Sequence, residues 1–218
     1  MSILNKIKMI EFPTDQYIKQ ETLKSQIVIH HTASGSDEKG DVLTWKNDPR
    51  RIATPIIITR DGTPHQLYST NFWAYHLGVN KRIEMLSIGV ELDSWGPLIK
   101  KGEDYYSWTG SKLINPKVTE YKNGWGRYPN SPFFLKEGVI NKPIKYFESY
   151  TPQQIETLCE LIQLWHQRRA IPKTYNEDMW NVSQRAISGA PGIWAHCSYV
   201  PKTDAHPQPE LIEALKQL

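Results

Sequence analysis

The sequence predicts a single α/β domain in which a mixed central β-sheet is flanked by helices. Two short apolar runs, "QIVIH" at 26–30 and "LSIGVELD" at 86–93, indicate buried strands. The segment 55–68, "PIIITRDGTPHQLY", indicates a hairpin, because two strand-like runs enclose the turn signal Asp61-Gly62. Strands and helices alternate without the regular spacing of repeated βαβ units, so we expect a mixed rather than a purely parallel sheet.

Residues 151–169 form the clearest predicted helix. Thr151 can cap it, Pro152 suits the first helical position, and Gln154 completes a capping box. Its apolar residues recur on one face, as expected for a helix packed on a sheet: Ile155, Leu158, Ile162 and Trp165. The remaining expected elements are a short helix within 36–48 capped by Ser36 or Asp37, a helix over 177–188, a strand over 192–200 and a closing helix over 207–218.

The stretch from about 98 to 150 differs in composition from the rest of the chain. Residues 101–150 hold 11 aromatic residues, which is twice the chain average of 11%. A flexible linker would not carry so many rings. We therefore expect an ordered, loop-rich insertion, at about 98–150, with a few short strands, lying within a single domain that spans 1–218. Its rings suit either a wall that binds substrate or a hydrophobic cap that only stabilises the fold.

Bulk composition narrows the classes of protein and partner. The chain of 218 residues is 39% hydrophobic and 22% charged, which is typical of a globular protein. A net charge of +3 is too small to indicate nucleic-acid binding, and no run approaches the roughly 20 apolar residues of a membrane span. Two cysteines, Cys159 and Cys197, cannot define a disulfide framework. We expect a monomer that binds neither nucleic acid nor membrane and that lacks a signal peptide.

Three polar residues stand where predicted strands end: His30, Glu91 and His196. Sites gather at strand ends because loops converge there while the sheet stays rigid. The segment after His196, "CSYVPKTDAHP", adds Lys202 and Asp204. Two imidazoles and one carboxylate match the ligand set of a catalytic zinc ion, although many such triples can be drawn from this chain.

Four motifs in order, "VIHHTAS", "AYHLGVN", "SIGVELDS" and "AHCSYVPKTD", resemble those of the zinc-dependent N-acetylmuramoyl-L-alanine amidases. This family includes phage endolysins, wall-recycling amidases and animal peptidoglycan recognition proteins. The resemblance covers residues 25–95 and 150–218. It implies an α/β fold, a Zn²⁺ cofactor and a peptidoglycan or muropeptide substrate. The expected reaction is cleavage of the amide bond between N-acetylmuramic acid and L-alanine of the stem peptide by zinc-activated water.

Position by position, the resemblance implies that His30, His196 and Asp204 hold the zinc ion. Glu91 is then expected to orient and deprotonate the water, and Lys202 to stabilise the oxyanion of the scissile carbonyl. These residue types suit amide hydrolysis, which needs a nucleophile at neutral pH and a positive group at the developing alkoxide.

The remaining candidates are less directly specified. Neighbouring residues on a strand face opposite sides, so His31 is expected to be a buried, hydrogen-bonded residue rather than a ligand. His76 matches a position that lines the substrate groove in the family, and Trp108 and Trp125 of the insertion are further candidates for substrate binding. His206 departs from the family pattern and is a candidate for a supporting role near Asp204.

A second interpretation is a non-catalytic peptidoglycan-binding module of the same fold, as in relatives that have lost a zinc ligand. A third is a sugar- or protein-binding domain whose aromatic insertion is the binding surface. The filled ligand positions, together with Glu91 and Lys202, favour catalysis. Without an evident signal peptide, we expect cytoplasmic synthesis followed by action on the cell wall, as for a phage or prophage endolysin, or recycling of muropeptides in the cytoplasm.

Overall fold

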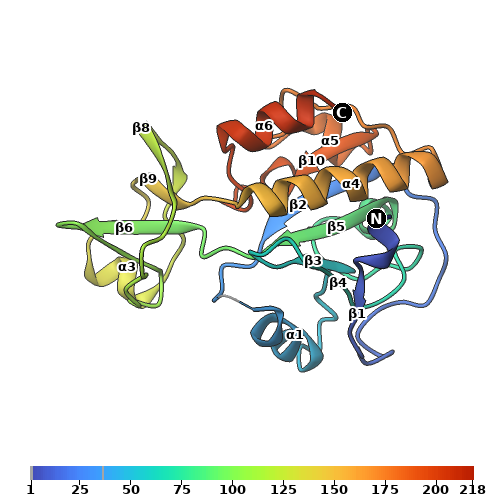
Figure 1. Cartoon of the computed structure of the whole chain (residues 1–218), viewed down its shortest axis with the longest axis horizontal. Coiled ribbons are helices and arrows are strands. Elements are labelled where there is room, and N and C mark those ends of the chain that lie inside the picture. Colours follow the sequence, from blue (N-terminus) through green and yellow to red (C-terminus); the bar gives the residue numbers. More distant parts are fainter. Residues whose placement is uncertain (1, 36) are drawn as a thin grey trace.

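A six-stranded mixed sheet forms the centre of the protein in this computed structural model, which describes residues 2–35 and 37–218 (Figure 1). In this sheet only the strands Ile56–Ile58 and Pro64–Gln66 pair in antiparallel fashion, and all other pairs of neighbouring strands are parallel. The predicted α/β class with a mixed sheet is therefore confirmed. In spatial order the strands are β1 (Lys8–Met9), β4 (Pro64–Gln66), β3 (Ile56–Ile58), β5 (Ser87–Leu92), β2 (Gln26–His31) and β10 (Gly192–Ala195).

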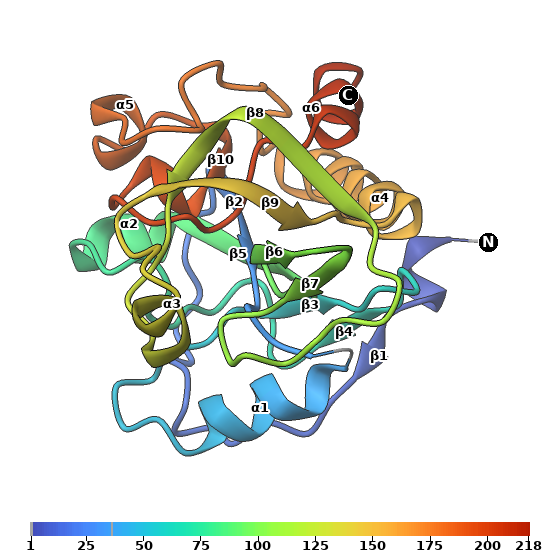
Figure 2. The same ribbon diagram turned by 90° about the vertical axis from the view of Figure 1, so that its left-hand side faces the viewer.

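Helices cover both faces of this sheet. On one face lie α4 (Pro152–Arg169) and α6 (Pro209–Lys216), and α1 (Glu38–Lys46) lies on the other (Figure 1, Figure 2). Side-chain alternation along β3 explains the two layers, because Ile56 and Ile58 join the core beneath α4 while Ile57 packs with Val42 of α1. None of the described helices is long and apolar enough to cross a membrane.

The helix boundaries agree with the capping signals in the sequence. Thr151 and Gln154 form the predicted capping box at the start of α4. Asp37 caps α1 by accepting a hydrogen bond from the amide of Lys39, whereas the alternative cap, Ser36, lies outside the described residues. The hairpin at 55–68 and the closing helix are also present, as β3–β4 and α6.

Two expected elements are shorter than the sequence suggested. The helix expected over 177–188 is reduced to α5 (Gln184–Ile187), because Asp178 accepts a hydrogen bond from the hydroxyl of Ser183, which caps α5. Such local side-chain bonds compete with a longer helix. The strand expected over 192–200 ends at Ala195 and continues as a single 3₁₀ turn, η2 (His196–Ser198), whose Ser198 hydroxyl accepts from the Ala195 amide.

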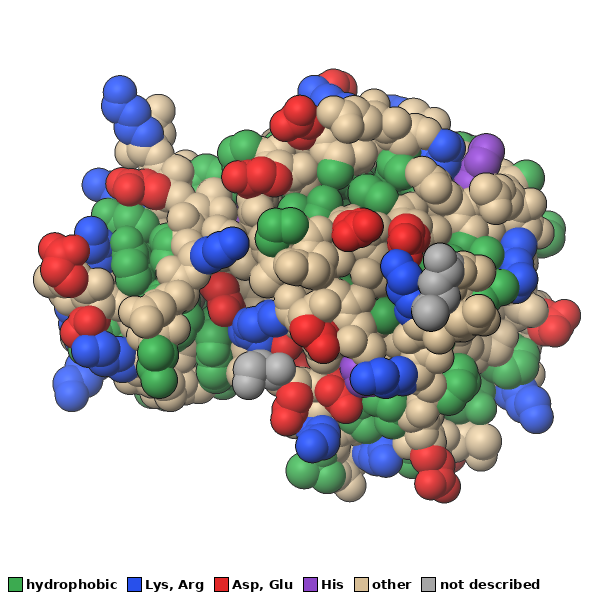
Figure 3. Space-filling view, viewed as in Figure 1, with side chains coloured by type: hydrophobic (Ala, Val, Ile, Leu, Met, Phe, Trp, Pro, Cys, Tyr) green, Lys and Arg blue, Asp and Glu red, His purple; other side chains and the backbone are tan. Residues whose placement is uncertain are grey.

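The aromatic insertion contains more regular structure than expected. Residues 97–148 form a second, fully antiparallel sheet with its own small core, to which Phe134, Ile144 and Phe147 contribute. This sheet projects from one end of the molecule, and the outline is indented between it and the part that includes α1 (Figure 3). In spatial order its strands are β7 (Asp104–Tyr106), β6 (Pro97–Lys101), β9 (Pro143–Glu148) and β8 (Val118–Arg127), with the short helix α3 (Pro132–Lys136) beside them.

Ionic contacts join the two ends of the insertion to the central sheet. Arg60, in the turn between β3 and β4, pairs with Asp93 at 2.5 Å and with Glu148 at 2.7 Å. The same Glu148 carboxylate accepts the amide of Trp95 at 2.5 Å. The ring of His206 stacks on Phe147 of the insertion with centroids 4.6 Å apart. We therefore propose that the insertion is an elaboration of one catalytic domain rather than a separate unit.

Gly96 allows the first strand of the insertion to approach His31. It has a φ of +65°, and a Cβ added there would overlap the imidazole of His31. Gly102 has a similar φ of +59° but open space around it. The two glycines thus separate the cost of a left-handed conformation from the cost of the overlap.

We expect Gly96→Ala to lower the free energy of unfolding by about 2–4 kcal/mol, since it adds steric overlap to the conformational cost. Gly102→Ala, the matched control, should lose only about 1–2 kcal/mol. Urea denaturation of both variants measures the difference. Equal losses would contradict the close packing of His31 beneath Gly96.

Candidate metal centre and its cavity

The parallel pairing of three strands brings the candidate residues to one edge of the sheet. His30 lies opposite Glu91 in the β2–β5 ladder, and Ile29 lies opposite Ala195 in the β2–β10 ladder. His196 follows Ala195 directly. The three side chains therefore lie at neighbouring strand ends, as the sequence predicted.

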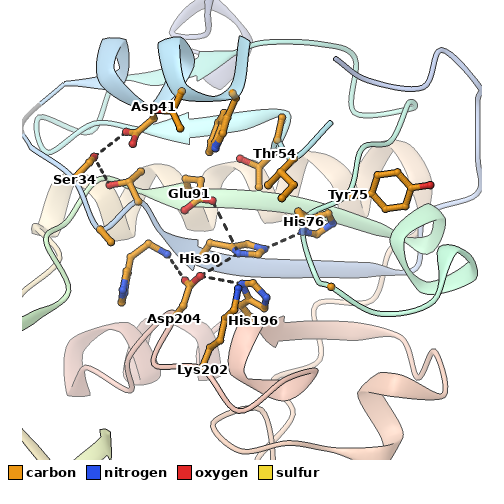
Figure 4. Close-up of a pocket in the computed structure, with 18 of the residues that line it drawn as sticks. His30, Ser34, Asp41, Thr54, Tyr75, His76, Glu91, His196, Lys202 and Asp204 are labelled. Carbon is orange, nitrogen blue, oxygen red and sulfur yellow. Dashed lines mark hydrogen bonds and ion pairs between the residues drawn. The ribbon is translucent and has the colours of Figure 1, made fainter. Parts of the chain in front are cut away.

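The loop after β10 returns Asp204 to this edge. Its Oδ2 lies 2.9 Å from Nδ1 of His196 and 3.6 Å from Nδ1 of His30 (Figure 4). Donor atoms of the three residues all lie within 4.8 Å of one another. A tetrahedral zinc site with bonds of 2.0–2.2 Å needs donors roughly 3.3 Å apart, so this set fits such an ion after small shifts.

Both imidazoles are oriented by hydrogen bonds from their far nitrogens. Nε2 of His196 donates to the carbonyl of Leu77 at 3.3 Å, and Nε2 of His30 lies 2.9 Å from Nδ1 of His76. In each ring the Nδ1 atom is thereby turned toward Asp204. Such outer partners fix the tautomer and the orientation of histidine ligands.

One short loop, residues 76–78, supplies both of these supports. Its backbone amides donate to the buried carboxylate of Glu84 on α2 (Lys81–Leu86), at 2.9–3.2 Å from the nearest oxygens. His76 in turn contacts the hydroxyl of Ser87 through Nε2 at 2.8 Å. Sequence reasoning missed Glu84 and Ser87, since an acid within a short helix gives no pattern that marks it as buried.

Glu91 and Lys202 lie beside the three donors in different environments. Glu91 is buried, its Oε1 lies 4.0 Å from Nδ1 of His30, and its Oε2 has no hydrogen-bond partner among the described residues. Burial, with the nearby charge of Asp204, raises the pKa of Glu91 well above its usual range. Lys202 is exposed at the rim of the same cavity.

The charges of the donor set follow from burial and from mutual contact. Burial lowers the pKa of His30 to about 4, so the ring is neutral at physiological pH and its Nδ1 is free to bind a metal ion. Burial alone would raise the pKa of Asp204, but the close contacts of its carboxylate with His196 and His30 outweigh it and hold that pKa well below its usual range. Asp204 is therefore anionic at neutral pH, as a candidate metal ligand should be.

A cavity of about 580 Å³, here called the main cavity, opens over these residues (Figure 4). Its floor includes His30, Glu91, His196 and Asp204, and it extends along α1 past Trp45, Thr54 and Tyr75. A second cavity of about 410 Å³, here called the insertion cavity, lies against the second sheet. Trp108, Lys202 and Asp204 line both cavities.

The four remaining candidates occupy environments that the sequence did not reveal. Trp108 lies between the two cavities, with its indole N–H donating to the carbonyl of Ala33 at 2.7 Å. Trp125 lines neither of them and packs between the central core and the core of the insertion. It also lines a third cavity, together with Arg127 and Lys202, so its role in substrate binding stays a prediction.

The two histidines have hydrogen-bond partners that the sequence did not reveal. His76 lines the main cavity, but both of its ring nitrogens are engaged, by His30 and Ser87, so its ring supports a candidate ligand instead of offering a free donor to substrate. His206 is fully buried, with Nδ1 bonded to the hydroxyl of Tyr121 at 2.8 Å and Nε2 to the carbonyl of Glu148 at 3.1 Å. It anchors the insertion.

His31 is buried on the opposite side of β2 from His30, as strand geometry requires. Its ring packs against Gly96, and its Nδ1 lies 3.4 Å from the hydroxyl of Tyr150. Its backbone amide donates to Oδ1 of Asp204 at 2.6 Å. His31 therefore contacts Asp204 through the backbone alone. The neighbouring Cys197 is buried, which raises the pKa of its thiol and makes it a poor nucleophile.

A family model described as N-acetylmuramoyl-L-alanine amidase matches residues 21–210. The chain belongs to this amidase family. A comparison with curated protein sequences gives no significant match. The family membership makes the protein a peptidoglycan amidase, a hydrolase of the cell wall.

Several solved structures share the fold of this amidase at low sequence identity. PlyL is 10% identical with a TM-score of 0.54, and the match covers 96% of each chain. The catalytic domain of XlyA is 13% identical with a TM-score of 0.53, over 96% of this chain and 98% of that one. A mutant endolysin from Bacillus subtilis is 13% identical with a TM-score of 0.54, over 97% and 96% of the two chains.

The two adjacent histidines give a test of which side chain binds metal. We expect His30→Ala to abolish stoichiometric metal binding, because it removes one of three donors. His31→Ala should keep its metal, since the contact of His31 with Asp204 is made by the backbone. It should lose about 2 kcal/mol of stability through the lost packing.

Metal analysis and thermal unfolding of both variants measure these effects. A His31→Ala protein without metal, together with a His30→Ala protein that retains it, would reverse the assignment of the two histidines.

Proposed function

We propose that this amidase cleaves the bond between N-acetylmuramic acid and L-alanine of the stem peptide with the help of a zinc ion. His30, His196 and Asp204 would hold the ion. The observation that carries the proposal is the convergence of two buried donors and one half-buried donor beside the unpartnered Oε2 of Glu91, in a chain that belongs to the amidase family. When bound in such a site, zinc lowers the pKa of a water molecule to about 7 and polarises a carbonyl oxygen.

Glu91 is suited to move the proton of the attacking water. Its Oε2 is buried and makes no hydrogen bond to the described residues, so it can accept a hydrogen bond from water in the cavity. Its raised pKa brings the carboxylate closer to the pH at which a general base works well. A proton taken up at Oε2 can then be passed to the nitrogen of the departing alanine.

Lys202 is suited to stabilise the negative charge that develops on the scissile carbonyl. It lies two residues before Asp204 on the same loop and lines the cavity above the donor set. Its side chain forms no ion pair with any described carboxylate, so its ammonium is free to face the substrate. A positive group at a developing oxyanion stabilises the transition state more than the ground state.

Trp108 is the insertion residue best placed to contact the substrate, because it separates the two cavities that meet at Lys202. We propose that the chain acts as a monomer on cell-wall peptidoglycan or its fragments, in the manner of an endolysin. A non-catalytic binding module of the same fold has no need for a base and a cation beside three donors, so the complete set favours catalysis.

The function can be tested with a defined muropeptide and mass spectrometry of its products. We expect free N-acetylmuramic acid and a peptide that begins with L-alanine. Chelation should abolish turnover, and added Zn²⁺ should restore it. At a free zinc concentration 100 times the dissociation constant, the bound ion should stabilise the fold by about 2.7 kcal/mol. Full turnover by verified metal-free protein would refute the zinc mechanism.

The roles of Glu91 and Lys202 predict variants that bind metal and fail in chemistry. Glu91→Ala and Lys202→Ala should each lower kcat and kcat/KM together by about 10²-fold or more, with metal content unchanged. Lys145→Ala, which removes an exposed lysine of β9, is the control and should retain wild-type turnover. Near-normal kcat in Lys202→Ala with zinc in place would assign the oxyanion to another group.

A further inference from the structure

The insertion cavity carries an unpaired positive charge that the chemistry at the metal centre does not explain. Arg127, the last residue of β8, lines this cavity and is exposed. No carboxylate among the described residues pairs with it. Lys202 lines the same cavity and is also without an ionic partner. The two cations therefore face one hollow, and the only acid lining it is the candidate ligand Asp204.

Arg127 and Lys202 each adjoin a residue of a closely packed pair, Gly126 and Thr203. Gly126 precedes Arg127, and a Cβ added to Gly126 would lie 2.5 Å from Cγ2 of Thr203, the residue that follows Lys202. Gly126 has a φ of +62°, so the strand end reaches the catalytic loop through a conformation that favours glycine. An anionic ligand placed in the cavity that both cations line is attracted by each of them.

The main cavity has the opposite charge balance. Lys202, which both cavities share, is its only lysine or arginine among the described residues, whereas Asp41, Glu84 and Glu91 all line it. A carboxylate placed deep in the main cavity would meet these acids. A carboxylate placed in the insertion cavity would meet Arg127, whose planar guanidinium can form two parallel hydrogen bonds to it.

The two arms of the substrate differ in the same way. The carboxyl group of muramic acid is consumed in the scissile amide, so the sugar arm is neutral. The stem peptide carries free carboxylates beyond its L-alanine. Because the two cavities meet at Lys202, a substrate whose scissile carbonyl faces this residue extends one arm into each cavity.

We propose, on the basis of the proposed function, that the insertion cavity is the stem-peptide subsite and that Arg127 binds a carboxylate of the peptide. The neutral sugar arm then lies in the main cavity, along Trp45 and Tyr75. Arg127 is in this assignment a specificity residue: it distinguishes a stem peptide with a free α-carboxylate at its second residue from one in which that group is amidated. The rings of Trp108 and Tyr128 form the apolar sides of the peptide subsite.

Binding of a free stem peptide tests this assignment without relying on turnover. The probes are L-alanyl-γ-D-glutamyl-L-lysine and the same tripeptide with its α-carboxylate amidated, titrated by calorimetry into the wild-type protein and two variants. Arg127→Gln should weaken binding of the acid form by about tenfold or more and leave the amidated form nearly unchanged. Lys122→Gln removes an exposed lysine from the same strand, outside both cavities, and should change neither affinity.

Equal affinities of wild type and Arg127→Gln for the acid tripeptide would overturn the inference. It would also be overturned if a peptide-free sugar fragment protected Arg127 and Tyr128 from exchange or chemical modification while the tripeptide did not. Turnover of the intact muropeptide is measured alongside. If the protein cleaves the muropeptide but its affinity for the tripeptide does not depend on Arg127, the subsite is refuted and the proposed function stands. If the affinity depends on Arg127 but the muropeptide is not cleaved, the proposed function is refuted and the subsite stands.

Discussion

The register of three parallel strands is the constraint on which the rest of this structure depends. It sets His30 opposite Glu91, and it ends β10 one residue before His196. Because side chains alternate along a strand, a slip of one residue would turn His31 toward the cavity and His30 into the core. The apolar residues that precede these histidines, Ile27 and Ile29, are fully buried and oppose such a slip. Hydrophobic packing thereby selects which imidazole joins the candidate donor set.

The loop at residues 76–78 extends this constraint to the orientation of the rings. The side chain of His76 restrains the ring of His30, and the carbonyl of Leu77 restrains the ring of His196. Both contacts depend on Glu84, whose carboxylate accepts hydrogen bonds from the backbone amides of the loop. Preorganised donors lose little entropy when a metal ion binds, so in the proposed zinc site an acid outside the donor set would contribute to metal affinity.

The sequence predicted the elements whose signals are local. The capping box of α4 and the turn at Asp61-Gly62 involve residues a few positions apart, and their physics does not depend on the rest of the fold. The cluster of His30, His196 and Asp204 was expected as well, from the resemblance of four motifs to those of a known family. The true partners of His76 and His206 could not be predicted, because a hydrogen bond to Ser87 or to Tyr121 depends on tertiary contacts that leave no periodic pattern.

The insertion shows the same limit on a larger scale. Its rings correctly indicated an ordered segment, yet the sequence did not reveal that they pack into a second antiparallel sheet. Antiparallel pairing over 97–148 depends on matches between distant positions, such as Leu98 with Tyr146. The sequence offers no signal that distinguishes Trp108 from Trp125. In the structure Trp108 lines the main cavity, whereas Trp125 packs between the central core and the core of the insertion.

The joined ends of the insertion have an evolutionary consequence. The amide of Glu148 donates to the carbonyl of Gly96 at 2.9 Å, so the chain leaves the central sheet and returns to it at almost the same point. A segment closed in this way can lengthen or shorten at small entropic cost, since that cost grows only with the logarithm of its length. The insertion can therefore change while the strands that carry the candidate donors keep their register. Such changes would reshape the insertion cavity, which lies against the second sheet, and leave the candidate donor set in place.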